Sequence, residues 1–179
     1  MTSFADLGVP AVLTKTLDKL GITTPTPIQA ATLPDSLAGR DVLGTAQTGT
    51  GKTAAFALPI LSQLDLSQKT PQALVLAPTR ELALQVSEAI TSYSAGSDLR
   101  VLPVYGGQSY GAQLQGLKRG AHIVVGEHAA LVDLPVADLE HGRRHAEHQA
   151  RRRLVAGGEL EAALQCRRRA DQAGQVVAI

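Results

Sequence analysis

Apolar residues follow two spacings between residues 9 and 125 of this 179-residue chain. Short, nearly continuous apolar runs predict buried strands at Asp41–Gly44, Gln72–Ala77, Leu99–Tyr105 and His122–Val125. Longer segments between them predict helices at Val9–Leu20, Pro27–Leu37, Ala54–Leu61, Arg80–Tyr93 and Ser109–Lys118. Strands that are apolar throughout and alternate with helices are typical of a parallel sheet with helices on both faces. The pattern therefore predicts an α/β fold.

A glycine-rich segment follows the first predicted strand. Ala46–Thr53 fits the phosphate-loop pattern G-x-x-x-x-G-K-[ST], except that alanine replaces the first glycine. Gly49 and Gly51 let backbone N–H groups converge on phosphate oxygens, while Lys52 can reach the β- and γ-phosphates and the Thr53 hydroxyl can bind Mg²⁺. A helix that starts here adds its positive dipole end. The segment therefore predicts a nucleotide triphosphate site rather than a flexible turn.

Length and composition indicate one soluble domain, with 44% hydrophobic residues. The chain contains no apolar run of about 18 residues, which argues against a membrane protein, and no secretory leader, so the expected location is cytoplasmic. Cys166 is the single cysteine and has no disulfide partner. The net charge of +1 argues against a protein that binds nucleic acid by charge alone. Any contact with nucleic acid must therefore be local.

The composition changes after residue 125. Residues 126–179 contain eight arginines and no lysine, and eight acidic residues offset the arginines. Two explanations stay open, a solvated helical face and a disturbed reading frame. We expect residues 1–133 to form an ATP-binding domain and residues 134–179 to be an atypical Arg/Ala-rich tail, helical only between Leu154 and Cys166.

Four segments in order resemble motifs of the DEAD-box RNA helicases. Gly21–Gln29 is similar to the Q motif of that family, Ala46–Thr53 to its motif I including the alanine, Pro78–Ala83 to its motif Ia, and Gly106-Gly107 to the glycine pair that follows. The resemblance runs from Phe4, where the family carries an aromatic residue, to about Val125. It implies a P-loop, RecA-like fold and ATP-dependent RNA remodelling, with ATP and Mg²⁺ as cofactors.

The resemblance also implies the residues that hold ATP. They are Phe4, Thr24, Gln29, Ala46, Gln47, Thr48, Gly49, Thr50, Gly51, Lys52 and Thr53, with Lys52 also catalytic and Thr53 bound to Mg²⁺. The Gln29 carboxamide offers a donor and an acceptor that suit N6 and N7 of adenine. Phe4 could stack on the base or anchor the N-terminal arm in the core, and both interpretations stay open.

RNA contact is implied for Pro78, Thr79, Arg80, Gly106 and Gly107. A hydroxyl and a guanidinium at a helix start can hold a backbone phosphate without reading sequence, and glycine lets the chain approach closely. The partner is single-stranded or structured RNA. The alternative for Arg80 is an ion pair with Glu81 that fixes the loop, and for the glycine pair an ordinary turn.

The chain departs from the family after Val125. Gly126–Ala130 replaces Gly-Thr-Pro-Gly-Arg, and neither Asp-Glu-Ala-Asp nor Ser-Ala-Thr occurs, the nearest acidic pairs being Asp138-Leu139-Glu140 and Glu159-Leu160-Glu161. The resemblance implies that hydrolysis needs the acidic motif and a second RecA-like lobe. We therefore expect an incomplete N-terminal lobe of an ATP-dependent RNA helicase. The alternatives are a non-catalytic ATP- and RNA-binding fragment and a pseudogene product.

Overall fold

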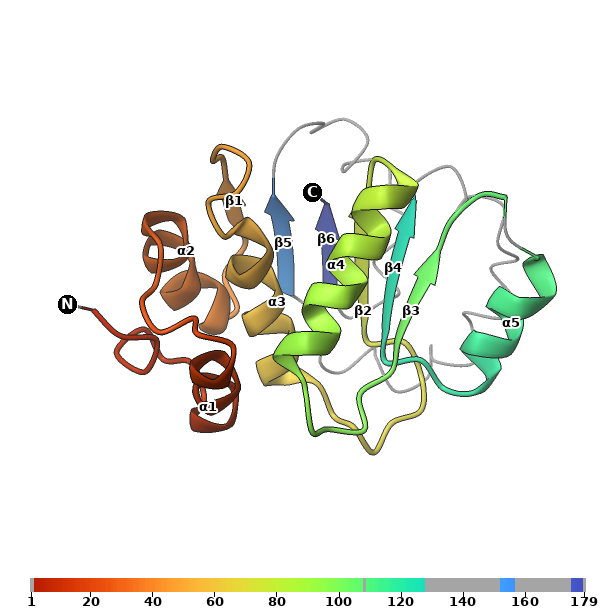
Figure 1. Ribbon diagram of the computed structural model, residues 1–179, viewed down its shortest axis with the longest axis horizontal. Coiled ribbons are helices and arrows are strands. Elements are labelled where there is room, and N and C mark those ends of the chain that lie inside the picture. The colour runs from red at the N-terminus through yellow and green to blue at the C-terminus, as the bar shows by residue number, and fades with distance from the viewer. Residues whose placement is uncertain (1, 108, 128–151, 157–174, 179) are drawn as a thin grey trace.

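A computed structural model describes residues 2–107, 109–127, 152–156 and 175–178. In this part of the chain one parallel sheet holds six strands in the order β1-β5-β6-β2-β4-β3 (Figure 1). The strands are β1 Val42–Gly44, β2 Ala73–Ala77, β3 Val101–Val104, β4 Ile123–Glu127, β5 Arg152–Ala156 and β6 Gln175–Ala178. Because every pair is parallel, the carboxyl ends of all these strands lie at one edge, the upper one in Figure 1.

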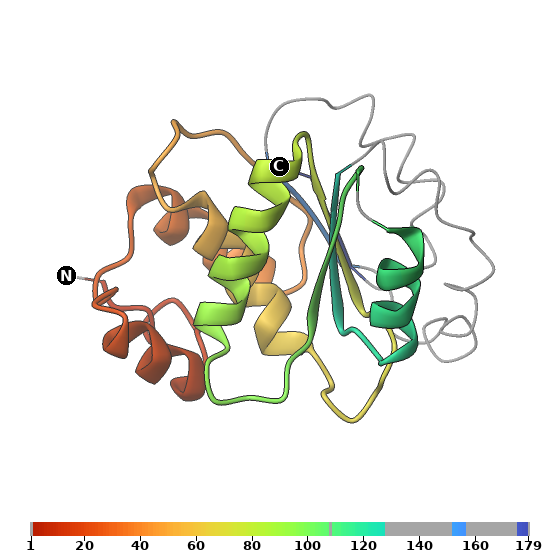
Figure 2. The same cartoon turned by 45° about the vertical axis from the view of Figure 1, so that its right-hand side comes forward.

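Helices cover both faces of the sheet, as predicted. They are α1 Ala11–Lys19, α2 Pro27–Leu37, α3 Lys52–Gln63, α4 Arg80–Tyr93 and α5 Tyr110–Lys118. Figure 2 shows α3 and α4 on one face and α5 on the other, with α1 and α2 outside α3. The bounds of α2 and α4 are those predicted from the sequence, and α1, α3, α5 and β1 to β4 begin and end within a few residues of their predicted bounds. No strand was predicted for β5 or β6.

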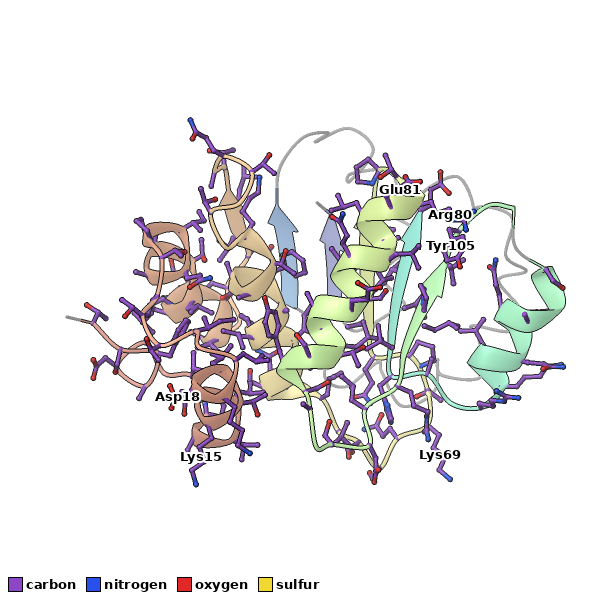
Figure 3. All side chains as sticks on the ribbon, viewed as in Figure 1. Lys15, Asp18, Lys69, Arg80, Glu81 and Tyr105 are labelled. Carbon is purple, nitrogen blue, oxygen red and sulfur yellow. The ribbon has the colours of Figure 1, made fainter. Side chains whose placement is uncertain are left out.

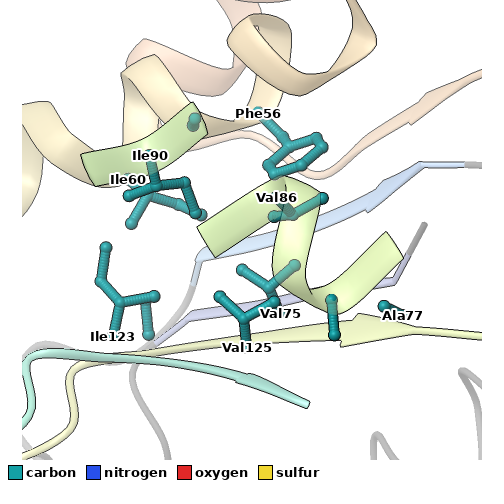
Figure 4. Close-up of a cluster of buried hydrophobic side chains, with 11 residues drawn as sticks. Phe56, Ile60, Val75, Ala77, Val86, Ile90, Ile123 and Val125 are labelled. Carbon is teal, nitrogen blue, oxygen red and sulfur yellow. The ribbon is translucent and has the colours of Figure 1, made fainter. Parts of the chain in front are cut away.

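Apolar side chains from α3, α4 and the central strands form the main core (Figure 4). Phe56 and Ile60 of α3 and Ile90 of α4 pack with Val75 of β2 and Val125 of β4, and each of these side chains is at most 2% exposed. A smaller cluster that includes Val104, Leu117 and Val124 holds α5 against the other face. The apolar strands β2 and β4 are therefore largely buried from both sides, as expected for a parallel sheet. The prediction of a buried strand was wrong for β1, where Leu43 is 66% exposed.

Two segments of the expected tail lie within the sheet. We predicted a helix from Leu154 to Cys166, and this was wrong for Leu154–Ala156, which belong to β5. The strand pairs with β1 on one side, with Val42 opposite Leu154, and with β6 on the other. A strand with ladder hydrogen bonds on both sides is stabilised by its neighbours, and this outweighs a weak local pattern. The remainder of the predicted helix, residues 157–166, lies outside the described residues.

None of the helices in the described ranges combines the length and the apolar character needed to span a bilayer.

Candidate functional site

The phosphate loop connects the carboxyl end of β1 to the start of α3. Gly49 and Gly51 have φ angles of +80° and +83°, which suit glycine because it has no Cβ. Gly51 is the residue immediately before α3. The Thr50 hydroxyl donates to the carbonyl of Gln47 at 2.6 Å, and Lys52 Nζ donates to the carbonyl of Ala46 at 2.6 Å. These two bonds fold the loop onto itself, with the ammonium of Lys52 inside the turn.

The outer part of this loop faces solvent at the helix start. Gln47, Thr48 and Gly49 are exposed, whereas Lys52 and Thr53 in the first turn of α3 are half-buried. Open space surrounds Gly49, since a Cβ there would meet no atom within 4 Å. Exposed backbone N–H groups at a helix N-terminus form a ready site for an anion. The loop can therefore receive phosphate oxygens.

Gln29 ties helix α2 to the phosphate loop. Its side chain is 2% exposed, and its Nε2 donates to the carbonyl of Gly51 at 2.9 Å. Its Oε1 accepts from the N–H of Thr26 at 3.0 Å, which satisfies a backbone donor at the start of α2. A Cβ on Gly51 would lie 2.4 Å from Gln29 Nε2. Glycine is therefore required at position 51 for its backbone angle and for this contact.

The residues expected around adenine lie in different surroundings. Thr24 is exposed. Gln29 uses one donor and one acceptor within the protein, so pairing with a purine would use the second N–H and the second lone pair of its carboxamide. Phe4 is 3% exposed and packs with Val9 and Leu33. This packing matches the core-anchor interpretation of Phe4, and stacking on a base would require the ring to leave the cluster.

The Thr53 hydroxyl is the Mg²⁺ ligand that the phosphate-loop pattern predicts, and the loop contains no carboxylate. Among the described residues, no three His, Cys, Asp or Glu side chains come together in a way that could hold a metal ion. Mg²⁺ keeps several waters and takes most of its other ligands from bound phosphates, so one hydroxyl at position 53 fits that mode of binding. The acidic pairs at 138–140 and 159–161 lie outside the described residues.

A second polar patch follows β2 and β3 at the same sheet edge. Pro78, Thr79 and Arg80 are exposed, and Thr79 Oγ1 accepts from the N–H of Leu82 at 3.2 Å, which caps α4. The guanidinium of Arg80 lies 4.6 Å from the centre of the Tyr105 ring (Figure 3). This cation–π contact fixes Arg80. The ion pair with Glu81 that we had considered does not form in the described part of the chain.

The glycine pair lies beside Arg80. Gly106 and Gly107 are exposed, and Gly107 has a φ of +78°. A Cβ at Gly107 would lie 4.0 Å from an Arg80 terminal nitrogen. The Gly106 N–H donates to Glu127 Oε2 at 3.2 Å. The structure therefore brings the residues predicted for RNA into one patch, and β5 and β6 separate this patch from the phosphate loop in the sheet order.

Sequence reasoning missed two residues of this patch, Tyr105 and Glu127. Tyr105 ends one predicted strand and Glu127 lies two residues after the end of another, at the edge where a parallel sheet gathers its ligands. Their position at the strand ends was therefore a usable signal. Their partners were not readable, because Arg80 and Tyr105 are 25 residues apart in the numbering and Gly106 and Glu127 are separated by 21.

Comparison with known proteins gives consistent results. Residues 26–155 match the family described as DEAD/DEAH box helicase. The chain is 57% identical over 132 residues to an ATP-dependent RNA helicase DeaD of Mycobacterium tuberculosis, covering 73% of this chain and 23% of the relative. It is 55% identical over 133 residues to DeaD of Escherichia coli, covering 74% and 21%. The chain therefore spans about a fifth of the length of these relatives.

A solved structure shares the fold. The crystal structure of a DEAD box protein from the hyperthermophile Methanococcus jannaschii superimposes with a TM-score of 0.74 at 24% sequence identity. The match covers 99% of this chain and 50% of that protein. It confirms the predicted P-loop, RecA-like fold.

Proposed function

Because this chain belongs to the DEAD/DEAH box helicase family, we propose that it forms the ATP-binding and RNA-contacting lobe of an ATP-dependent RNA helicase. One observation carries the proposal most directly. The phosphate loop at the end of β1 is held against α2 by the bond between Gln29 and Gly51, next to the start of α3. The loop that would bind phosphates is thereby linked to the residue that would recognise the base.

Different groups of the loop would bind different parts of a triphosphate. Backbone N–H groups between Gln47 and Thr53 would hold phosphate oxygens, and Lys52 would exchange the carbonyl of Ala46 for a phosphate oxygen. Mg²⁺, bound beside Thr53, would neutralise phosphate charge. The free donor and acceptor of Gln29 would favour adenine, because guanine presents an acceptor at O6 where adenine presents a donor.

The second patch would position RNA through its backbone. Arg80, held over Tyr105, can donate to phosphate oxygens, and the exposed Gly106-Gly107 turn admits a phosphate closely. Such contacts fix the position of a strand without reading its sequence. Closure onto a second RecA-like lobe would complete the remodelling cycle in the intact relative. A cytoplasmic location for this activity remains our proposal from the sequence.

A non-catalytic role is the second candidate for the 179-residue polypeptide. The observation that favours it is the absence of Asp-Glu-Ala-Asp and Ser-Ala-Thr strings from the sequence. Without acidic-motif carboxylates, the metal has no carboxylate ligand from the family motif and the attacking water has no base. This candidate predicts ATP binding without turnover.

Calorimetric titration with ATP and GTP tests the proposal. We expect the wild-type chain to bind ATP more tightly than GTP, and Lys52→Ala to remove most of the affinity for either. Lys69→Ala is the matched control, since it deletes an exposed lysine that lies far from the phosphate loop (Figure 3). Equal affinities for ATP and GTP would refute the adenine assignment. An unchanged affinity in Lys52→Ala would refute the phosphate role.

A further inference from the structure

Glu127 reaches from the end of one strand to the glycine pair at the end of the next. It is the last residue of β4, and the register of β3 and β4 places Val104 opposite Gly126. The strand ends therefore lie side by side, and Glu127 Oε2 accepts the Gly106 N–H at 3.2 Å. A half-buried carboxylate thus occupies a backbone donor that otherwise faces solvent.

The donor that Glu127 occupies suits a phosphate. Gly106 and Gly107 form a turn in which Gly107 is in the left-handed region, and the backbone N–H groups of such turns can bind anions. The Arg80 guanidinium lies beside this turn and could donate to the same anion. Carboxylate and phosphate oxygens are both anionic acceptors, so they compete for one N–H. The carboxylate has the advantage that the fold already holds it in place.

The charge of the patch also opposes a phosphate. Among the described residues that follow β2, β3 and β4 at this edge, one guanidinium, on Arg80, is accompanied by two carboxylates, on Glu81 and Glu127. A surface that binds a nucleic acid backbone normally carries an excess of positive charge. The described residues of this patch carry a net charge of the opposite sign.

We propose that Glu127 is an internal anion that occupies the Gly106 N–H in place of an RNA phosphate and keeps the affinity of this patch for RNA low. The proposal rests on the RNA-contacting role proposed above and adds a residue that limits it. Binding of a strand at Gly106 and Gly107 requires the carboxylate to be displaced. Removing its charge should therefore strengthen binding.

Two substitutions separate the charge from the contact. Glu127→Gln removes the charge and keeps an acceptor for Gly106, whereas Glu127→Ala removes both. A unit charge about 5 Å from a phosphate corresponds to about a 4-fold change in affinity at the dielectric constant of water and about a 270-fold change at the effective value of about 20 near a protein surface. We expect Glu127→Gln to bind a fluorescein-labelled ten-nucleotide oligouridylate tighter than wild type by a factor in this range, and Glu127→Ala tighter still.

Glu88→Gln is the matched control. It removes the same charge from an exposed position within α4, outside the patch. Fluorescence anisotropy with the full chain should show less than about a twofold change for this variant at physiological salt, where charges beyond about 8 Å are screened. Thermal melts by circular dichroism verify that each variant is folded. Equal affinities of Glu127→Gln and Glu88→Gln, with binding present in wild type, would overturn the inference and leave the proposed function intact.

A second readout follows the donor itself. In ¹H–¹⁵N spectra, titration with inorganic phosphate should shift the Gly106 amide signal in Glu127→Ala and leave it nearly unchanged in wild type. An equal response in the two proteins would also overturn the inference. If no variant binds the oligonucleotide even at low salt, the RNA-contacting part of the proposed function fails together with the inference.

Discussion

Replacing Gln29 with alanine should weaken the contact between helix α2 and the phosphate loop and so destabilise the domain. The side chain is 2% exposed and makes two hydrogen bonds, to the Gly51 carbonyl at 2.9 Å and from the Thr26 N–H at 3.0 Å. Each such bond contributes about 0.5–1.5 kcal/mol net. Truncation also leaves an empty space next to Gly51. The packing there is tight, because a Cβ built on Gly51 would lie 2.4 Å from Gln29 Nε2.

Together these losses predict a decrease in the free energy of unfolding of about 1.5–3 kcal/mol. For a domain of this size, each kcal/mol lowers the melting temperature by about 2–4 °C, so we expect a decrease of about 3–12 °C. Urea and thermal unfolding followed by circular dichroism would measure both quantities. Gln115→Ala is the control, because Gln115 is exposed on α5. A loss below about 0.5 kcal/mol in Gln29→Ala, no larger than that of a surface substitution, would refute the reasoning.

Two further predictions concern turnover and pH. The 179-residue chain by itself should release phosphate from ATP at a background rate. The reason is that an arginine finger, which the family takes from a second lobe, alone contributes a factor of about 10³–10⁵ in rate. RNA-stimulated release that disappears in Lys52→Ala would instead show that a carboxylate such as Glu159 or Glu161 replaces the missing motif. Burial and the nearby Arg100 guanidinium lower the pKa of His122 in the folded chain. The unfolded chain therefore takes up a proton at this residue more readily than the folded chain does. The contribution of His122 to stability is present above about pH 6.5 and is lost as the pH falls through the lowered folded-state pKa. The free energy of unfolding measured in urea between about pH 7 and pH 5 should therefore fall less steeply in His122→Asn, which keeps an acceptor for the Arg100 N–H, than in wild type; equal slopes would contradict this assignment.

Local sequence determined most of the elements in residues 9–127. Apolar runs and helical spacing located the first four strands and the helices between them, because these patterns depend on neighbours only a few residues away. The phosphate loop was readable for the same reason. Its turn needs glycine at positions 49 and 51, where the φ angles are positive, and both glycines stand in the sequence at the expected spacing.

Tertiary structure decided how those elements meet. Gln29 contacts Gly51 across 22 residues, and Gly106 contacts Glu127 across 21. Phe4, left open between base stacking and core packing, lies in the core. Periodicity describes which face of an element is apolar, but it does not specify which neighbour covers that face or which backbone N–H a side chain can reach.

The strand order is also not specified by local patterns in the sequence. β5 and β6 lie between β1 and β2, although their residues come last in the chain and carry no clear strand pattern. A strand in the middle of a sheet gains hydrogen bonds from both neighbours, and those neighbours are far away in the sequence. The sequence by itself therefore determined the parts of the site that depend on local backbone conformation. The contacts between those parts depended on the order of the strands, because that order fixes which distant residues come within hydrogen-bonding distance.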